Sequence, residues 1–229
     1  KLVYSKKKKL MNGGVYFFRN FFLKSVKNKN LSLEEDILPS LIKKEIVNAK
    51  KFNSFFLDIG TPKNLNFAKN KFKEIFFKPA IFLDRDGVLN HDNGYTYKIK
   101  DLKLITKTIK FLKKKKNLYK FIVTNQAGIA KKKFSLKNFV NFQKHLLFEL
   151  SKHEIYINDT KFCPHHPDAS INKLKLNCDC RKPNTKMFKE LVNFWPINLQ
   201  KSIMIGDKMT DKLASTNFGI KYKYVKKIK

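Results

Sequence analysis

The chain has 229 residues, of which 42% are hydrophobic, and this is enough to bury the core of one ordinary domain and a smaller second piece. Its formal net charge is +32, which by itself suggests a polyanion as partner. Three of the 50 basic residues are arginines, and the lysines are spread along the whole chain. This pattern indicates a compositional bias, so we expect no nucleic-acid partner, although the positive field would still attract a phosphorylated substrate.

No apolar run approaches the roughly 20 residues that a membrane-spanning helix needs, and the lysine-rich start is not followed by the long apolar stretch of a signal peptide. The three cysteines Cys163, Cys178 and Cys180 lie close together and are odd in number. This fits a reduced compartment and a metal site better than a disulfide framework. We therefore expect a cytoplasmic protein that acts as a monomer and has no membrane partner.

Two blocks of sequence meet near residues 74–79. In the first block, Ser32 and Glu35 form the signature of a capping box at the start of a short helix. Residues 55–59 predict a strand that ends at a glycine turn.

The first block contains the sequence F-F-L-D-I-G-T-P at residues 55–62, which resembles the C-terminal part of the sugar-phosphate nucleotidyltransferases. The resemblance implies a metal-binding role for Asp58. The glycine-rich nucleotide-binding loop with which those enzymes begin does not precede Asn12. We therefore expect residues 1–76 to be a partial segment, inactive by itself, from a fused or truncated two-enzyme polypeptide.

From residue 79 onward, strand and helix patterns alternate, which predicts an α/β fold with a parallel sheet covered on both faces. The expected strands are 81–84, 120–124, 155–163, 202–206 and 221–225. Helical patterns lie between them, one of them capped by Ser135. Because ligands of such sheets bind beyond the carboxyl ends of the strands, polar residues at those ends are the candidate site.

The first strand runs directly into D-R-D-G, which places Asp84 and Asp86 one residue apart at a strand end. The first carboxylate of such a pair can attack phosphorus and bind a metal, while the second exchanges a proton with the leaving oxygen. Gly87 then allows the backbone to turn tightly beside a substrate. By itself this sequence also fits a polar turn, so its meaning depends on the rest of the chain.

The second strand end reads T-N-Q-A-G at residues 124–128. Thr124 and nearby backbone N–H groups are suited to hold phosphoryl oxygens, although the same residues also fit an ordinary turn. The residues after it are expected substrate contacts: Asn125, Gln126 and Ala127.

Two more sequence segments complete the set of candidate site residues. Lys182 is placed to neutralise a transferring group, and Arg181 to fork onto a second phosphate. Asp207 ends another strand in a carboxylate suited to Mg²⁺, with Asp211 one helical turn beyond it. Because lysine is so common in this chain, the presence of Lys182 alone says little about function. Arginine is rare here, so Arg181 is the more informative residue.

The order of these pieces resembles that of the haloacid dehalogenase-like phosphatases, from about residue 79 to the C-terminus. The resemblance implies a haloacid dehalogenase-like Rossmannoid sheet over residues 77–229. It also implies that Asp84 forms an aspartyl phosphate, that Asp86 acts as acid and base, and that Thr124 and Lys182 stabilise the transferring group. The implied Mg²⁺ ligands are Asp84, the Asp86 carbonyl and Asp207.

An insert before Arg181 carries a second candidate metal site, formed by C-P-H-H-P and C-D-C. Three thiolates and one imidazole make a closed tetrahedral zinc site, which would order a long loop that has little core of its own. The expected structural Zn²⁺ ligands are Cys163, His165, Cys178 and Cys180. His166 is expected to be a neighbour of this site.

Within the family, D-R-D-G-V-L-N, V-T-N-Q-A-G-I-A, C-P-H-H-P and C-D-C-R-K-P resemble the branch that acts on heptose bisphosphates. This implies Mg-dependent removal of the 7-phosphate from a small phosphorylated sugar. The sequence does not distinguish between the α- and β-anomers of that sugar. The implied substrate contacts are the loop residues Asp92, Asn93, Gly94 and Tyr95, together with Arg181 and Lys208. Asp211 would orient Lys208 or a metal-bound water. Ala127 stands where a serine is common in the family.

Two alternatives remain at this point. A histidinol-phosphate phosphatase would share the zinc insert and D-R-D-G, but Asn90, Gly94-Tyr95 and His165-His166 favour the heptose substrate. A non-catalytic, zinc-bearing module that binds polyanions would show salt-sensitive nucleic-acid binding and release no phosphate.

Overall fold

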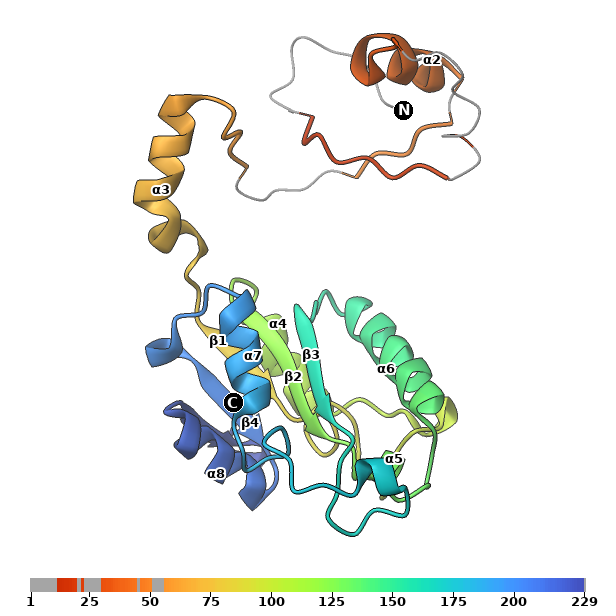
Figure 1. The fold of residues 1–229 in the computed structure, drawn as a ribbon, viewed down its shortest axis with the longest axis vertical. Coiled ribbons are helices and arrows are strands. Elements are labelled where there is room, and N and C mark those ends of the chain that lie inside the picture. The colour runs from red at the N-terminus through yellow and green to blue at the C-terminus, as the bar shows by residue number, and fades with distance from the viewer. Residues whose placement is uncertain (1–11, 20–21, 23–29, 45, 51–55, 229) are drawn as a thin grey trace. The chain divides into compact units, whose positions relative to one another are not determined.

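The structure is a computed structural model that describes residues 12–19, 22, 30–44, 46–50 and 56–228. The chain divides into two compact units, Lys1–Ala68 and Lys69–Lys229, and each is described by itself (Figure 1). The division falls within helix α3 (Pro62–Phe76), whereas the sequence places the boundary at the C-terminal end of this helix.

The first unit contains a short π-helical turn, η1 (Leu33–Ile37), followed by α2 (Leu38–Lys43). The Ser32 hydroxyl accepts the Glu35 N–H at 3.2 Å, which confirms the predicted cap. The reciprocal bond runs from the Ser32 N–H to Asp36 at 2.7 Å, and not to Glu35.

The strand predicted for residues 55–59 is wrong over the part that the structure describes. Phe55 lies outside the described residues, and residues 56–59 have no strand assignment. A strand needs a neighbour for its backbone hydrogen bonds, and no described residue pairs with this segment.

The second unit is built on a five-stranded parallel sheet in the order β3-β2-β1-β4-β5. The strands are β1 (Ala80–Leu83), β2 (Tyr119–Asn125), β3 (Asp159–Cys163), β4 (Ile203–Gly206) and β5 (Lys221–Tyr224). The helices are α4 (Thr106–Lys113), α5 (Ala127–Ala130), α6 (Leu136–Ser151), α7 (Lys186–Phe194) and α8 (Met209–Phe218). Short 3₁₀ turns are η2 (Ile99–Asp101), η3 (Asn172–Leu174), η4 (Leu199–Lys201) and η5 (Val225–Lys227). All five predicted strands are present, and β3 begins later than expected.

The sheet is buried on both faces, as continuous apolar strands require. Ile81 and Leu83 of β1 pack in a core with residues of α4 and α6, while Ala80 and Phe82 pack in a second core with residues of α7 and α8. Figure 1 shows these helices around the strands. The Ser135 cap of α6 is confirmed as a capping box with Asn138.

The strand register decides which polar residues meet. Leu83, the last residue of β1, lies opposite Ile122 of β2 and Ile205 of β4. The residues that follow these positions therefore converge at one edge of the sheet, where ligands of this architecture bind. Within the described part of the chain, no helix has the length and apolar character needed to cross a bilayer.

Candidate active site

Asp84 lies directly after β1 and is 5% exposed. Its Oδ1 accepts a hydrogen bond of 2.9 Å from the Nζ of Lys182, which also donates to the Val123 carbonyl at 2.7 Å. Burial lowers the pKa of Lys182, but the charges of Asp84 and Asp211 outweigh it and leave this pKa above its usual value. A protonated ammonium therefore lies beside the proposed nucleophile.

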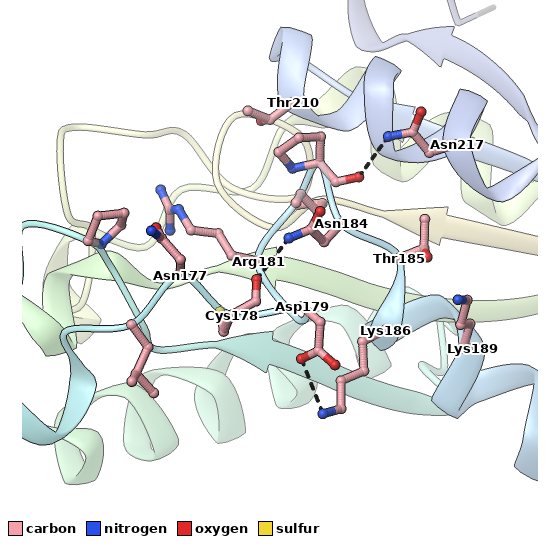
Figure 2. Close-up of a pocket in the computed structure, with 14 residues that line it drawn as sticks. Asn177, Cys178, Asp179, Arg181, Asn184, Thr185, Lys186, Lys189, Thr210 and Asn217 are labelled. Atoms are coloured by element: carbon pink, nitrogen blue, oxygen red, sulfur yellow. Dashed lines mark hydrogen bonds and ion pairs between the residues drawn. The ribbon is translucent and has the colours of Figure 1, made fainter.

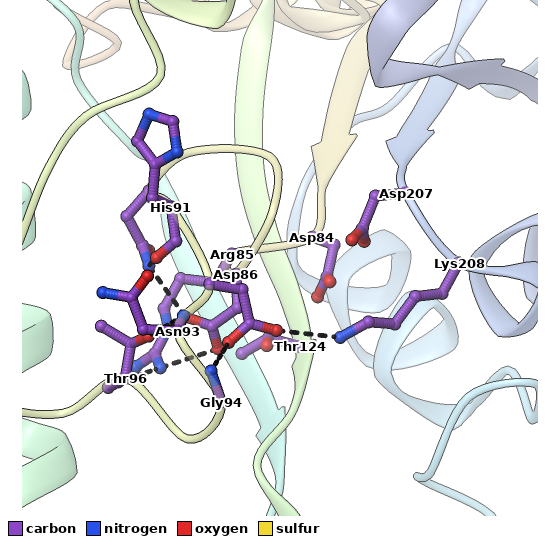
Figure 3. Close-up of polar contacts among 12 residues, drawn as sticks. Asp84, Arg85, Asp86, His91, Asn93, Gly94, Thr96, Thr124, Asp207 and Lys208 are labelled. Atoms are coloured by element: carbon purple, nitrogen blue, oxygen red, sulfur yellow. Dashed lines mark hydrogen bonds and ion pairs between the residues drawn. The ribbon is translucent and has the colours of Figure 1, made fainter.

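Asp207 follows β4 and lies near Asp84 (Figure 3). Burial, reinforced by the neighbouring charge of Asp84, raises the pKa of Asp207 to about 6. Its Oδ1 is buried and has no hydrogen-bond partner among the described residues. A side chain at Gly87, which has φ of 80°, would collide with Asp207, because an added Cβ would lie 2.3 Å from its Oδ2.

Asp211, at the start of α8, is 1% exposed. Its Oδ1 lies 2.6 Å from the Nζ of Lys182, and its Oδ2 accepts the backbone N–H groups of Asp207 and Lys208 at 3.2 and 3.1 Å. Asp211 thus contacts the backbone of Lys208, and its expected role of orienting Lys208 or a metal-bound water stays a prediction. Asp211 also contacts Lys182 and the turn that carries Asp207.

Asp86 accepts four N–H groups from three side chains. Its Oδ1 receives Arg85 Nε at 3.0 Å and Asn90 Nδ2 at 2.9 Å. Its Oδ2 receives Arg85 Nη2 at 2.8 Å and Gln126 Nε2 at 2.9 Å. The Gln126 amide also donates to the Thr124 hydroxyl at 3.0 Å, so it connects the proposed acid–base residue to the proposed phosphate contact.

Asn125 pairs with the backbone of Lys182. Its Nδ2 donates to the Lys182 carbonyl, and its Oδ1 accepts the Lys182 N–H, both at 3.0 Å. The amides of Asn125 and Gln126, which the sequence assigns to substrate, therefore bond to neighbouring protein groups. Ala127 follows as the first residue of α5, and the substrate contacts of all three stay predictions.

The loop at 92–96 comes close to the same edge of the sheet (Figure 3). Asp92 accepts the Gly94 N–H at 3.0 Å and also receives the Nζ of Lys208 at 3.3 Å. Burial lowers the pKa of Lys208, but the charges of Asp84, Asp207 and Asp92 outweigh it and raise this pKa. Tyr95 is 41% exposed and has φ of 57°. The loop and Lys208 thus place exposed polar groups near the two carboxylates.

The predicted zinc ligands form one cluster, since donor atoms of Cys163, His165, Cys178 and Cys180 all lie within 4.8 Å of one another. The three sulfur–sulfur distances are 3.2, 3.3 and 3.4 Å, and His165 Nδ1 lies 3.3 Å from the Cys180 Sγ. These distances are too long for disulfides. His166 is separate, because its Nδ1 accepts the Asp168 N–H at 3.0 Å.

Cys178 of this cluster is one of the residues that line a pocket of about 840 Å³ (Figure 2). Arg181 and Lys182 line it, together with Asp179 and Lys186, which form an ion pair of 3.2 Å. Arg181 donates to the His165 carbonyl at 3.4 Å. The pocket does not include the carboxylates at the ends of β1 and β4, so we do not equate it with the reaction centre.

Sequence reasoning missed the contacts that Arg85 and Asn90 make with Asp86, and the ion pair of Asp211 with Lys182. Arg85 is 0% exposed, which its position inside D-R-D could have indicated, since a charged residue beside a strand end needs partners. The pairing of Asp211 had no signal, because one lysine among so many is uninformative.

Three comparisons with known proteins agree with this geometry. Residues 179–227 match the HAD-hydrolase-like family. The chain is 37% identical over 139 residues to the D-glycero-β-D-manno-heptose-1,7-bisphosphate 7-phosphatase of Escherichia coli O6:H1, covering 60% of this chain and 73% of that protein. It is 39% identical over 140 residues to the protein of the same name from Photorhabdus laumondii, covering 60% and 74%.

Two solved structures share the fold. A protein described as a HAD-like phosphatase from Mesorhizobium loti has a TM-score of 0.60 and 28% identity, covering 63% of this chain and 70% of that one. The D,D-heptose 1,7-bisphosphate phosphatase of B. bronchiseptica, complexed with magnesium and phosphate, has a TM-score of 0.56 and 23% identity, covering 63% and 78%. Together with the curated relatives, this likeness identifies the chain as a member of the D-glycero-β-D-manno-heptose-1,7-bisphosphate 7-phosphatase family of haloacid dehalogenase-like proteins.

Proposed function

We propose that this chain is a phosphatase that removes the 7-phosphate of D-glycero-D-manno-heptose 1,7-bisphosphate through an aspartyl phosphate on Asp84. The observation that carries the proposal is the buried pair of Asp84 and Lys182, 2.9 Å apart beside Asp207, in a chain related to enzymes of that name. The relatives are named for the β-anomer, which makes this anomer the first substrate to assay.

The donor groups of the site fit Mg²⁺, a cation that prefers oxygen ligands. Oxygens of Asp84, Asp207 and Asp211 lie within 4.8 Å of one another, and Asp207 keeps a buried oxygen with no partner among the described residues. Asp211 is already bonded to Lys182 and two backbone N–H groups, which favours Asp84, Asp207 and the Asp86 carbonyl as ligands. When bound, the cation would neutralise negative charge between the nucleophile and the phosphoryl group.

The first chemical step forms a bond between an Asp84 oxygen and phosphorus while the bond from phosphorus to the sugar O7 breaks. Asp86 gives its proton to that oxygen, and Thr124 and Lys182 bind the equatorial phosphoryl oxygens. In the second step Asp86 takes a proton from water, whose oxygen attacks phosphorus. The bond between phosphorus and the Asp84 oxygen breaks, and inorganic phosphate and a free carboxylate result.

The remaining charged groups support recognition of a bisphosphate. Lys208 and Arg181 would bind the phosphate that is not transferred, and residues 92–95 would contact the sugar. Lys208 is bonded to Asp92 at 3.3 Å, so an incoming phosphate would compete with this carboxylate.

We further propose that the cluster of three cysteines and His165 binds one structural Zn²⁺. Zn–S bonds of about 2.3 Å would place sulfurs roughly 3.8 Å apart around a tetrahedral ion, somewhat wider than the distances observed. Four protein ligands leave no open position for a substrate. The ion would therefore hold the loop that carries Arg181 and Lys182.

The test is phosphate release from both anomers of heptose 1,7-bisphosphate, and from histidinol phosphate, by the wild type and Asp84→Asn. We expect the β-anomer to be hydrolysed fastest and the variant to lose at least about 10³-fold in kcat, because an amide cannot replace the attacking carboxylate. Asp58→Asn, an exposed change in the first unit, serves as control and should leave the rate unchanged. Preference for histidinol phosphate would change the substrate assignment to that compound. Full activity of Asp84→Asn would refute the assignment of Asp84 as the nucleophile.

A further inference from the structure

Arg85 is a fully buried arginine, with 0% exposure, between the two aspartates of the site. Its guanidinium carbon lies 4.8 Å from the ring centroid of Phe142 and 5.4 Å from that of Phe139, both on α6. Burial of a permanent charge is costly unless it is paired and hydrogen-bonded. The partners that compensate the charge of Arg85 therefore indicate what this residue does.

The first partner is the Asp86 carboxylate. Arg85 binds it in a bidentate manner, through hydrogen bonds of 3.0 Å from Nε and 2.8 Å from Nη2. Paired bonds of this kind fix the plane of a carboxylate as well as its position. Asn90 and Gln126 add one amide donor each, so Asp86 accepts four N–H groups in all, two of them from Arg85. The two bonds from Arg85 join opposite charges, whereas the amides of Asn90 and Gln126 are neutral donors.

The second partner is the loop that follows the site. Arg85 Nη2, the same nitrogen that binds Asp86, donates to the Thr96 carbonyl at 2.9 Å. Thr96 is 4% exposed, and its hydroxyl accepts the Asn93 N–H at 3.0 Å. One guanidinium thus connects the proposed acid–base residue to the loop expected to contact the sugar.

We propose that Arg85 is a positioning residue that fixes Asp86 relative to the loop at 92–96, so that proton transfer between Asp86 and the sugar oxygen depends on it. This rests on the proposed function, in which Asp86 is the acid and base. Arg85 touches no reacting atom, so it acts through Asp86. Its pairing with aromatic rings on α6 holds the guanidinium in one orientation.

The test compares wild type and Arg85→Lys on two substrates that differ in their leaving group. Lysine keeps the positive charge but cannot form the paired hydrogen bonds of the guanidinium to Asp86. A sugar alkoxide needs a proton as it leaves, whereas p-nitrophenolate does not. We expect kcat for the alkyl phosphate to fall about 100-fold, the size of an acid–base contribution. The pre-steady-state burst of p-nitrophenolate should fall less than about threefold, because that step does not need the acid.

Two controls separate positioning from a general loss of structure. Phe188→Leu thins the core on the other face of the sheet, and it should lower thermal stability without changing the ratio of the two rates. In an Asp86→Asn background, Arg85→Lys should cause no further loss beyond about threefold, because there is no acid left to position. Equal losses for both leaving groups, or additive losses in the double variant, would overturn the proposal.

Failure of the proposed function would be visible separately. If the wild type hydrolyses another alkyl phosphate and not the heptose bisphosphate, the substrate assignment fails. The comparison of leaving groups is then made with that alkyl phosphate, and its result decides the role of Arg85.

Discussion

Asp207 is an acid whose charge the folded protein disfavours, because burial and the neighbouring Asp84 raise its pKa from 3.8 to about 6. Between these two values the folded chain holds a proton that the unfolded chain has released. The stability of protein freed of Mg²⁺ should therefore fall as the pH rises through this window.

The measurement is denaturant unfolding at about pH 4.5 and 7 after dialysis against magnesium-free buffer. We expect Asp207 to contribute a loss on the order of 1–2 kcal/mol on going to the higher pH, after allowance for solvent screening. Asp207→Asn has no such titration, and its stability should change less over the same interval. An identical pH dependence in both proteins would contradict this account. Added Mg²⁺ should restore the wild type at pH 7, because it compensates the unpaired charge.

At the scale of elements, the strand ends were predictable because polar residues that follow parallel strands converge at one edge of a sheet. Asp84, Thr124 and Asp207 needed no more than this rule. The direction in which the Arg85 side chain points was not predictable. The aromatic rings that it packs against come from α6, more than fifty residues further along the chain. The strand predicted over residues 56–59 was wrong for a related reason. The pattern of this segment suits a strand, but the sequence does not say whether a neighbouring strand exists to pair with it.

The insert between β3 and α7 depends on its metal cluster, which brings together pairs of ligands from its two ends. We expect about one zinc per wild-type chain, and less than about 0.1 in Cys178→Ser, because three ligands hold the ion weakly. Metal analysis by mass spectrometry checks this, with proteolysis reporting loop order. His166→Asn is the matched control and should retain zinc, since the Nδ1 of His166 is bonded to the Asp168 N–H. Loss of zinc in this variant would place His166 among the ligands.

At the scale of the whole molecule, the charge of +32 should affect how fast an anionic substrate arrives. Raising KCl from about 0.05 to 0.5 M should lower kcat/KM for heptose bisphosphate roughly fivefold while kcat stays constant, because salt screens the field but not the buried site. Steady-state kinetics with p-nitrophenyl phosphate provide the comparison, and its lower charge should give a smaller decrease. An equal decrease for both substrates would exclude steering by the field.

The order of strands also has a consequence for synthesis of the protein. β1 pairs with β4 through Phe82 and Met204, so the edge that carries Asp84 is completed by residues far downstream in the sequence. While the ribosome is still translating the middle of the message, the nucleophile exists without Asp207 or Lys182. We therefore expect nascent or terminated products that lack Lys182 and Asp207 to be inert toward phosphate esters.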